Sequence, residues 1–390
     1  MTLLKTREQA RAWAEISRSA LLGNIHALRA RLGQDTKTRL LAVVKADAYG
    51  HDISQVAPLC FGAGILDFGV ATVDEGIALR ALLPAHALIY IMTASLPADA
   101  GAIAEHRLAP FVGDLLLARA LSEAAKKQKV VVDIHLDIDT GIGRAGALPR
   151  EAAALFSALQ ALPCVRVTGI ATHFADADED AQDAHRQNAL FQQALCRLGP
   201  EAEPLLVHAG NSPALLALGQ AAHYGLVRPG LLLYGIEPAP GLFAPDGMGV
   251  ETELALKPVM SLRARVLLCR RLSGGATVSY GRTYTVPPGG GVYATLGIGY
   301  GDGYPRRLGN GVGHALLAGQ SALICGRICM DQLVVDVSHI PHVQPGDIST
   351  LIGANGAHVI TAGLIAEAIQ TTPHEISTCL TRRVPRILTA

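Results

Sequence analysis

The segments VVVDIHL (130–136), EAAALFSALQAL (151–162) and VRVTGIATH (165–173) form two apolar runs separated by a stretch of helical period. The two outer runs are rich in β-branched residues, which favour strands. The middle stretch repeats apolar residues at i, i+3 and i+4, as one face of a helix does. Two strands joined through a helix are typical of a parallel βαβ unit. This part of the chain therefore predicts an α/β fold.

The same alternation fills roughly the first 235 residues. Helical stretches such as DEGIALRALL (74–83) and DLLLARALSEAAKKQ (114–128) lie between the apolar runs. About eight alternations predict a parallel (β/α)8 barrel, for which the length is right. A doubly wound open sheet is the competing arrangement. The apolar runs are LLAVV, which Lys45 closes, FGVAT (68–72), ALIYIM (87–92), LAPFV (108–112), VVVDIHL, VRVTGIATH, PLLVH (204–208) and YGLVRPG (224–230).

The pattern changes after about residue 240. The segment PAPGLFAPDGMG (238–249) is rich in Pro and Gly, which is typical of a linker. Beyond it, short β-branched runs with a period of two alternate with Gly- and Pro-rich turns, and one helix, TAGLIAEAIQ (361–370), interrupts them. We therefore expect the barrel in residues 1–240 and a mainly β domain in residues 241–390.

Composition and charge restrict the kind of protein. Half of the 390 residues are hydrophobic, and 33 basic residues balance 33 acidic ones. This balance gives no electrostatic reason to expect nucleic acid or an anionic membrane as a partner. Apolar runs are shorter than the roughly 20 residues of a membrane span, and the N-terminus lacks the apolar core of a signal peptide. The seven cysteines include no CxxC pair, so we expect reduced thiols, a cytoplasmic protein and no metal site.

Several polar residues follow the predicted strands directly. Barrel enzymes place their chemistry at the carboxyl ends of the strands, so these side chains should share one face. Each alone has an ordinary structural explanation, such as a solvated lysine or a core histidine. Their joint placement favours a functional site. They are Lys45 after the first strand, Arg144 after the fifth, His173 at the sixth, Asn211 and Ser212 after the seventh, and Arg228 at the eighth.

The chemistry of this set suits an anchored phosphate cofactor. An amine at the end of an apolar strand is partly desolvated, which lowers the pKa of Lys45 and favours the neutral form needed for imine formation. The Tyr49 hydroxyl, the Ser212 hydroxyl with nearby backbone amides, and the open backbone at Gly230 all suit one phosphate group. These features alone do not distinguish pyridoxal phosphate from a sugar phosphate.

Eight motifs, in order along nearly the whole chain, resemble those of the alanine racemase family, the barrel-type (fold type III) pyridoxal-phosphate enzymes. The resemblance implies an amino-acid isomerase that uses pyridoxal 5′-phosphate and acts on alanine as a homodimer with shared active sites. The motifs are AVVKADAYGH (42–51), DTGIGRAG (139–146), THFA (172–175), NSP (211–213), VRPG (227–230), VSYGRTY (278–284), IGYGDGYPRRL (298–308) and GRICMDQ (326–332).

The resemblance also implies roles for individual residues. Lys45 would carry the cofactor and act as one catalytic acid/base, and Tyr280 of the other subunit would be the second. The residues implied for cofactor binding are Lys45, Tyr49, His173, Asn211, Ser212, Arg228, Gly230 and Tyr234. Those implied for the substrate site are Arg144 and, from the β domain of the other subunit, Cys329, Met330 and Asp331, with Tyr300 at its entrance.

Elementary chemistry agrees with these roles. Racemisation removes a proton from one face of Cα and delivers one to the other, which requires two bases. A tyrosine with a pKa near 10 is a poor base unless cationic neighbours stabilise its phenolate, and His173 and Arg144 are candidates for this task. Arg228 is a permanent donor, so it would leave the pyridine nitrogen of the cofactor without a proton.

Two positions depart from the family pattern. Asp137 stands where many members have a lysine that can be carbamylated, and we expect its carboxylate to replace part of that negative charge. Arg382 stands where some members have a tyrosine. The main alternative is a racemase of broader specificity for serine or basic amino acids. A barrel-type decarboxylase does not match the NSP, RICMDQ and Arg228 pattern, and a non-catalytic pyridoxal-phosphate carrier would not explain Tyr280 or residues 241–390. The enzyme would supply D-alanine for peptidoglycan or degrade it.

Overall fold

A computed structural model describes residues 7–33, 37–238 and 254–390. Eight parallel strands close into a barrel in the first part of the chain, which confirms the predicted (β/α)8 architecture. The last strand pairs with the first, Arg39 with Leu226 and Leu40 with Val227, so the sheet has no open edge. The strands are β2 (Arg39–Val43), β3 (Asp67–Val70), β4 (Leu88–Ile91), β5 (Ala109–Val112), β6 (Val132–Asp137), β7 (Val165–Ala171), β8 (Leu206–His208) and β9 (Leu226–Val227).

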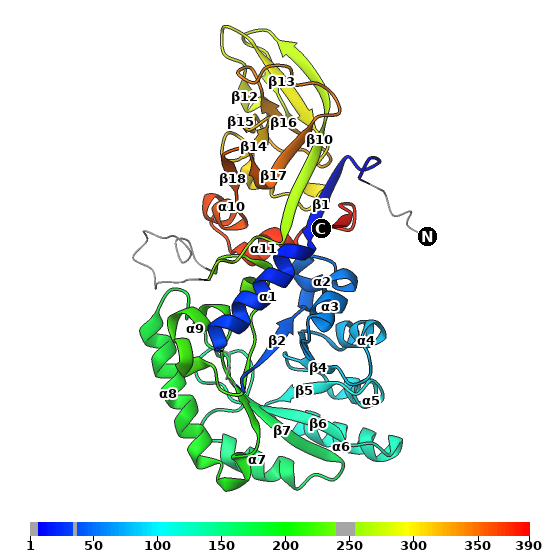
Figure 1. Ribbon diagram of the computed structural model, residues 1–390, viewed down its shortest axis with the longest axis vertical. Helices are drawn as coiled ribbons and strands as arrows, with labels where there is room; N and C mark the ends of the chain where they lie inside the picture. Colours follow the sequence, from blue (N-terminus) through cyan, green and yellow to red (C-terminus); the bar gives the residue numbers. More distant parts are fainter. Residues whose placement is uncertain (1–6, 34–36, 239–253) are drawn as a thin grey trace. The chain divides into compact units, whose positions relative to one another are not determined.

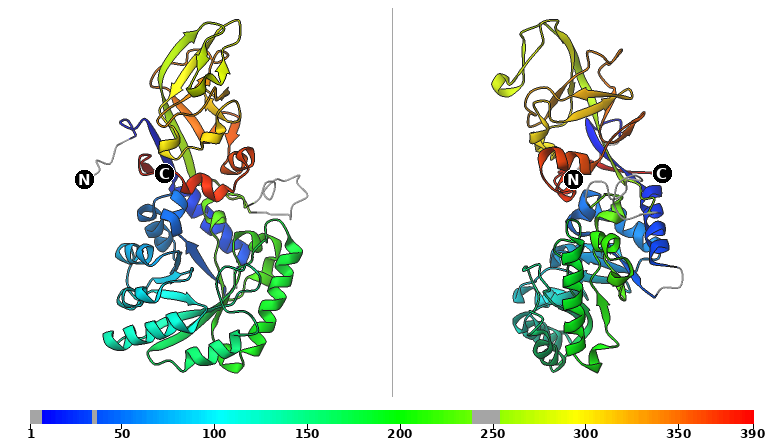
Figure 2. Two further views of the ribbon diagram at one scale, coloured as in Figure 1. Left: turned by 180° about the vertical axis from the view of Figure 1, so that it is seen from behind. Right: turned by 90° about the vertical axis from the view of Figure 1, so that its left-hand side faces the viewer.

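Helices lie on the outer side of the barrel strands (Figure 1), and the view from behind shows the same arrangement (Figure 2). Several begin at a side chain that accepts backbone N–H groups of the first turn, namely Thr72, Asp114 and Asp180. The helices are α1 (Arg18–Leu32), α3 (Ile53–Gly62), α4 (Val73–Leu82), α5 (Ala100–Glu105), α6 (Leu115–Gln128), α7 (Ala152–Gln160), α8 (Ala181–Arg197) and α9 (Ser212–Ala217).

The second compact unit is mainly β, as expected. Its nine-stranded sheet has the path β15-β14-β17-β10-β1-β19, with β13 on β10, β16 on β13, and β18 on β17. The bounds are β1 (Ala12–Ser17), β10 (Met260–Leu272), β13 (Gly291–Leu296), β14 (His314–Leu317), β15 (Gln320–Leu323), β16 (Leu333–Asp336), β17 (Ile348–Asn355), β18 (His358–Ile360) and β19 (Arg386–Thr389). Strands β11 (Thr277–Val278) and β12 (Tyr284–Thr285) form a separate pair.

The N-terminal strand corrects the expected division at residue 240. Strand β1 does not belong to the barrel, because it pairs antiparallel with β10 and parallel with β19 of the β unit. The physical reason is that Trp13, Ala14 and Ile16 lose all their exposed surface between these neighbours. Residues 239–249 of the expected linker lie outside the described residues.

The helix predicted at 361–370 is present as α10 (Ala362–Ile369). A second short helix, α11 (Pro373–Thr378), follows it, and the sequence pattern did not predict it. Within the described ranges, no helix combines the length and the apolar character needed to cross a membrane.

Candidate active site

The chain after β2 makes a left-handed turn that sets the direction of two candidate residues. In the segment Lys45–Gly50 (α2), the four residues from Ala46 to Tyr49 have φ between 51° and 56°. This region costs an L-residue roughly 1–2 kcal/mol, so surrounding contacts must hold the turn in place. One of them is the bond from the Ala48 N–H to the Val44 carbonyl, at 2.9 Å. The turn places Lys45 at the carboxyl end of the barrel and directs Tyr49 back toward β9.

Glu75 fixes the beginning of this turn. Its Oε1 accepts the Ala46 N–H at 2.7 Å, and its Oε2 accepts the N–H groups of Ala71 and Thr72 at 2.8 and 3.2 Å. Glu75 also completes a capping box with Thr72 at the start of α4. The sequence reasoning missed this residue, although the Thr-x-x-Glu spacing before an apolar helix is a recognisable signal.

The surroundings of Lys45 favour its neutral amine. Burial lowers the pKa of Lys45, and the nearby charge of Arg144 lowers it further, whereas Glu75 opposes both effects. The predicted desolvation of this amine therefore has a structural basis.

Tyr49, Ser212 and Gly230 come together beside this turn. A methyl group at Gly230 would lie 2.3 Å from Tyr49 Oη, so the hydroxyl uses the space that glycine leaves. Ser212 Oγ accepts the N–H groups of Gly230 and Leu232 at 2.9 and 3.2 Å. Because both acceptor positions of this hydroxyl are used, its hydrogen points elsewhere and can be donated to an anion.

Arg228 lies buried immediately after β9 and donates in several directions. Its Nη2 donates to the carbonyls of Thr172 and Ala209 at 2.7 and 3.2 Å, and its Nη1 lies 2.7 Å from His208 Nδ1. Burial lowers the pKa of Arg228 to about 10, while the charge of Asp137 opposes this change. The guanidinium therefore keeps its charge at neutral pH.

His173 lies next to this guanidinium, since its Nδ1 is 3.3 Å from Arg228 Nη2. Burial and the charge of Arg228 hold the pKa of His173 well below its ordinary value. A neutral imidazole that accepts at Nδ1 carries its proton on Nε2. His173 can therefore donate a hydrogen bond from Nε2 to an acceptor in the site.

Asp137 ends β6, and the loop that follows it carries Arg144. Burial raises the pKa of the Asp137 carboxyl to about 6, and the charges of Arg228 and Arg144 oppose that rise. Asp139 Oδ1 accepts the N–H groups of Gly141 and Gly143 at 2.9 and 3.1 Å, which shapes the loop so that Arg144 is exposed.

Two residues predicted to bind the cofactor have structural contacts of their own. The Asn211 side chain accepts the Ala214 N–H at 3.0 Å at the start of α9 and donates to the Phe174 carbonyl at 3.4 Å. Tyr234 is fully buried, and its backbone carbonyl accepts the Val259 N–H at 3.0 Å.

The candidate residues of the β unit gather around one loop. A shallow cavity of ≈ 540 Å³ is lined by Ser279, Tyr280 and residues 329–332, so it includes Cys329, Met330 and Asp331. The Tyr300 N–H donates to the Cys329 carbonyl at 3.0 Å, which places Tyr300 at the same loop. The side chains of Tyr280 and Met330 are 70% and 51% exposed, so this apolar and phenolic surface is open to a ligand or a partner.

An ion-pair network that the sequence did not predict supports this loop. Asp302 is buried, and its carboxylate contacts Arg11 Nη2 at 3.0 Å and Arg383 Nε at 3.1 Å. Arg383 also pairs with Asp331. The neighbouring Arg382, which departs from the family pattern, is exposed.

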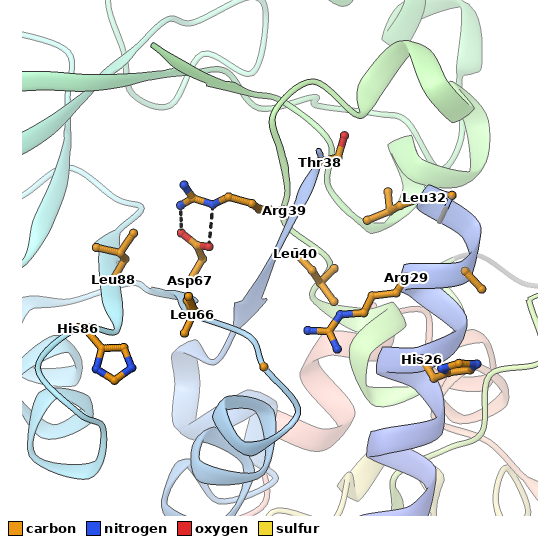
Figure 3. A pocket seen from close by; sticks show the side chains of 13 residues that line it. His26, Arg29, Leu32, Thr38, Arg39, Leu40, Leu66, Asp67, His86 and Leu88 are labelled. Atoms are coloured by element: carbon orange, nitrogen blue, oxygen red, sulfur yellow. Dashed lines mark hydrogen bonds and ion pairs between the residues drawn. The ribbon is translucent and has the colours of Figure 1, made fainter. Parts of the chain in front are cut away.

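Another cavity, of ≈ 590 Å³, lies at the opposite end of the barrel, where β2, β3 and β4 begin (Figure 3). Leu40, Leu66 and Leu88 line it together with the ion pair between Arg39 and Asp67. None of the candidate residues lines this cavity, and the amino-terminal face of a barrel generally serves stability.

Comparisons with known proteins identify the family and agree with the fold. Residues 16–238 match the family model of the alanine racemase N-terminal domain, and residues 259–388 match that of the C-terminal domain. The alanine racemase of Halothermothrix orenii is 37% identical over 381 residues, which cover 96% of each chain. The crystal structure of the Streptomyces lavendulae alanine racemase superposes with a TM-score of 0.89 at 34% identity, over 99% of this chain and 98% of that one.

A further solved structure bears on the cofactor. The alanine racemase of Bartonella henselae, described with covalently bound pyridoxal phosphate, superposes with a TM-score of 0.85 at 28% identity. The match covers 97% of this chain and 100% of that one. Because both domain models match and a relative is 37% identical over nearly the whole chain, the chain belongs to the alanine racemase family of pyridoxal-phosphate-dependent isomerases.

Proposed function

We propose that this protein interconverts L-alanine and D-alanine with two bases, Lys45 and Tyr280 of a second copy of the chain. The observation that carries the proposal is the placement of Lys45: its amine has a lowered pKa and lies at the carboxyl end of the barrel beside Tyr49, Ser212 and Gly230. An amine whose pKa is lowered, close to groups suited to phosphate, is what a pyridoxal-phosphate lysine requires.

The residues present fit this cofactor. Gly230 leaves the space in which Tyr49 Oη lies, and the Ser212 hydroxyl has its hydrogen available, so both hydroxyls can donate to one phosphate. When bound, pyridoxal 5′-phosphate supplies the electron sink for the electron pair left on Cα. We assign Asn211 and His173 to the same site from their positions after β8 and β7, and Tyr234 from the family resemblance alone.

The two proposed bases move protons on opposite faces of Cα. Lys45 Nζ takes or returns the proton on one face, and its lowered pKa keeps this amine able to accept. Tyr280 Oη acts on the other face. Its side chain is 70% exposed in one copy of the chain, so it is free to enter the site of another copy.

Arg228 and His173 adjust the site around these bases. Because Arg228 keeps its proton, it would donate to the pyridine nitrogen and leave that nitrogen unprotonated. His173, with its proton on Nε2, would donate to the Tyr280 phenol and ease formation of its phenolate. Arg144, Cys329, Met330, Asp331 and Tyr300 are assigned to the substrate and its entrance.

Asp137 is proposed to replace part of the negative charge that a carbamylated lysine provides in other members. With a pKa of about 6 it is mainly ionised at neutral pH, and it acts on both Arg228 and Arg144. A homodimer in the cytoplasm, supplying D-alanine for peptidoglycan, completes the proposal. The seven cysteines are all free thiols, as a reducing compartment would keep them.

The test is an enantiomer-resolved assay of the purified protein with pyridoxal 5′-phosphate, using L-alanine, L-serine and L-arginine as separate substrates. We expect D-alanine to form fastest, and the visible absorbance of the cofactor to disappear in Lys45→Ala. Faster conversion of serine or arginine would replace alanine by a broader substrate class. Absence of any racemisation by the loaded protein, with absorbance retained, would favour a carrier and refute the proposal.

Mixing two inactive variants tests the shared site. Lys45→Ala and Tyr280→Phe each spoil one base, and a dimer formed from one copy of each would contain one site with both bases intact. We therefore expect activity to appear on mixing after subunit exchange. If the two bases belonged to the same copy, the mixture would stay inactive.

A further inference from the structure

A line of buried side chains leads from Arg228 into the interior of the barrel. His208 Nδ1 lies 2.7 Å from Arg228 Nη1, and His208 Nε2 lies 2.6 Å from His135 Nδ1. All three side chains have 4% or less of their surface exposed. We propose that His135 is a positioning residue for Arg228: it fixes the tautomer and ring orientation of His208, and Gly169 provides the space that the His135 imidazole needs.

The proton positions follow from the chemistry of arginine. A guanidinium has only donors, so His208 Nδ1 must accept the bond from Arg228. A neutral His208 then carries its proton on Nε2 and donates it to His135 Nδ1, which leaves the His135 proton on its own Nε2. Burial and the charge of Arg228 lower the pKa of His135 to about 3 and that of His208 well below its ordinary value, so both rings stay neutral.

Gly169 explains how His135 reaches His208. His135 is on β6 and His208 on β8, so the contact must pass over β7, where Gly169 pairs with His135. A methyl group at Gly169 would lie 2.4–2.7 Å from three atoms of the His135 ring. No real side chain tolerates such contacts, so any larger residue would move the imidazole away from His208.

Other side chains of the barrel interior hold the His135 ring in this orientation. The Phe111 ring is parallel to it within 6° at a centroid distance of 5.8 Å, and Tyr90 meets it edge-on at 4.9 Å. The Tyr90 hydroxyl donates to Asp67 at 2.8 Å, and Asp67 pairs with Arg39 near the start of β2 (Figure 3). His135 therefore contacts a fixed polar cluster on one side and His208 on the other.

Loss of the His135 acceptor should release Arg228. The Nε2–H of His208 would then be buried without an acceptor, which destabilises this ring orientation and favours rotation of the ring. Rotation of the ring removes the acceptor that holds Arg228 Nη1. The guanidinium would keep its carbonyl contacts but lose the bond that fixes its plane, and the proposed pyridine contact depends on that plane.

This inference rests on the proposed function, and its test separates the two. Histidine ¹⁵N spectra of the unmodified holoenzyme should show His135 and His208 neutral between pH 6 and 8, each with its proton on Nε2. A proton on His208 Nδ1, or a charged His208, would overturn the inference even if alanine is racemised. Failure of the unmodified enzyme to racemise alanine would overturn the proposed function and leave this measurement intact.

Three variants add a functional measurement. His135→Leu removes the acceptor, His135→Asn retains one near the Nδ1 position, and Gly169→Ala displaces the ring without changing it. We expect His135→Leu and Gly169→Ala to lower kcat by about 10- to 100-fold, as supporting partners of active-site groups commonly do. KM should change little, the visible absorbance of the bound cofactor should shift, and His135→Asn should regain most of kcat.

Gly23→Ala is the matched control, because a methyl group at Gly23 has no neighbour within 4 Å. If His135→Leu and Gly169→Ala keep the wild-type absorbance and kcat, His135 does not position Arg228. If His135→Leu does not fold, Gly169→Ala and the wild-type spectra still decide the question.

Discussion

Replacing Gly230 by alanine should weaken cofactor binding through a steric clash with one side chain, that of Tyr49. The new methyl group would lie 2.3 Å from Tyr49 Oη, whereas unbonded heavy atoms rest about 3.5 Å apart, so the phenol must move by about 1 Å. Gly230 does not have a left-handed φ, so alanine causes no backbone strain there. The displaced hydroxyl loses its proposed hydrogen bond to the phosphate. A hydrogen bond to a charged group contributes about 1.5–3 kcal/mol, which predicts a roughly 10- to 150-fold rise in the Kd of pyridoxal 5′-phosphate.

The assay is a titration of the cofactor-free enzyme with pyridoxal 5′-phosphate, followed by absorbance, for four proteins: wild type, Gly230→Ala, Tyr49→Phe and the double variant. Since both single changes remove the same hydrogen bond, the double variant should bind little worse than either one. Gly23→Ala, an alanine added in open space, is the control. An unchanged Kd in Gly230→Ala would refute the reasoning, and so would fully additive losses in the double variant.

Three further predictions concern single residues. Asp137→Asn should raise the free energy of unfolding at pH 7.5 by up to about 3 kcal/mol. The pKa of Asp137 is about 6 in the folded protein against an ordinary value of 3.8, so the ionised carboxyl destabilises the fold increasingly as the pH rises between these values. Urea unfolding at pH 7.5 and 4.5 checks this, and an equal gain at both pH values would contradict it. Glu75→Ala leaves the N–H groups of Ala46, Ala71 and Thr72 without their acceptor, so it should cost about 2 kcal/mol in the same assay and lower kcat. Glu75→Gln should recover part of both losses, and a Glu75→Ala protein with wild-type kcat would show that the turn after Lys45 does not need this tether. Tyr280→Phe should slow Cα hydrogen exchange from L-alanine far more than from D-alanine, measured by deuterium incorporation; equal slowing would argue against one base on each face.

The sequence predicted the barrel well because the same periodic signal recurs eight times. Each apolar run sits between helical stretches, and no single run decides the fold. The N-terminal strand was the exception. AWAEIS (12–17) contains only two residues that favour strands, Trp13 and Ile16, and its partners β10 and β19 lie far along the chain. Pairing over such distances leaves no local signal in the sequence, so the division at residue 240 places residues 12–17 with the nearer domain.

The candidate site was predictable only in part, for a related reason. Residues directly after strands share a face by topology, which allowed Lys45 and Arg228 to be grouped from the sequence. The residues that hold these side chains in place lie on other strands and helices of the barrel. The contact between His135 and His208 depends on a missing side chain at Gly169, and an isolated glycine in a strand has many ordinary explanations. The left-handed turn of α2 is likewise hidden, because Ala and Tyr have no preference for positive φ.

The charge balance at the carboxyl end of the barrel connects binding with proton transfer. Arg228, Arg144 and Lys45 lie close enough to influence one another. Glu75 offsets the charge at Lys45, and Asp137, with a pKa of about 6, offsets the two arginines. This positive excess attracts a phosphate and a substrate carboxylate. It also disfavours any further cation, because it lowers the pKa of both Lys45 and His173. Neutralising Arg228 should therefore weaken ligand binding and change proton transfer together, whereas the loss of the Tyr49 hydroxyl should affect binding alone.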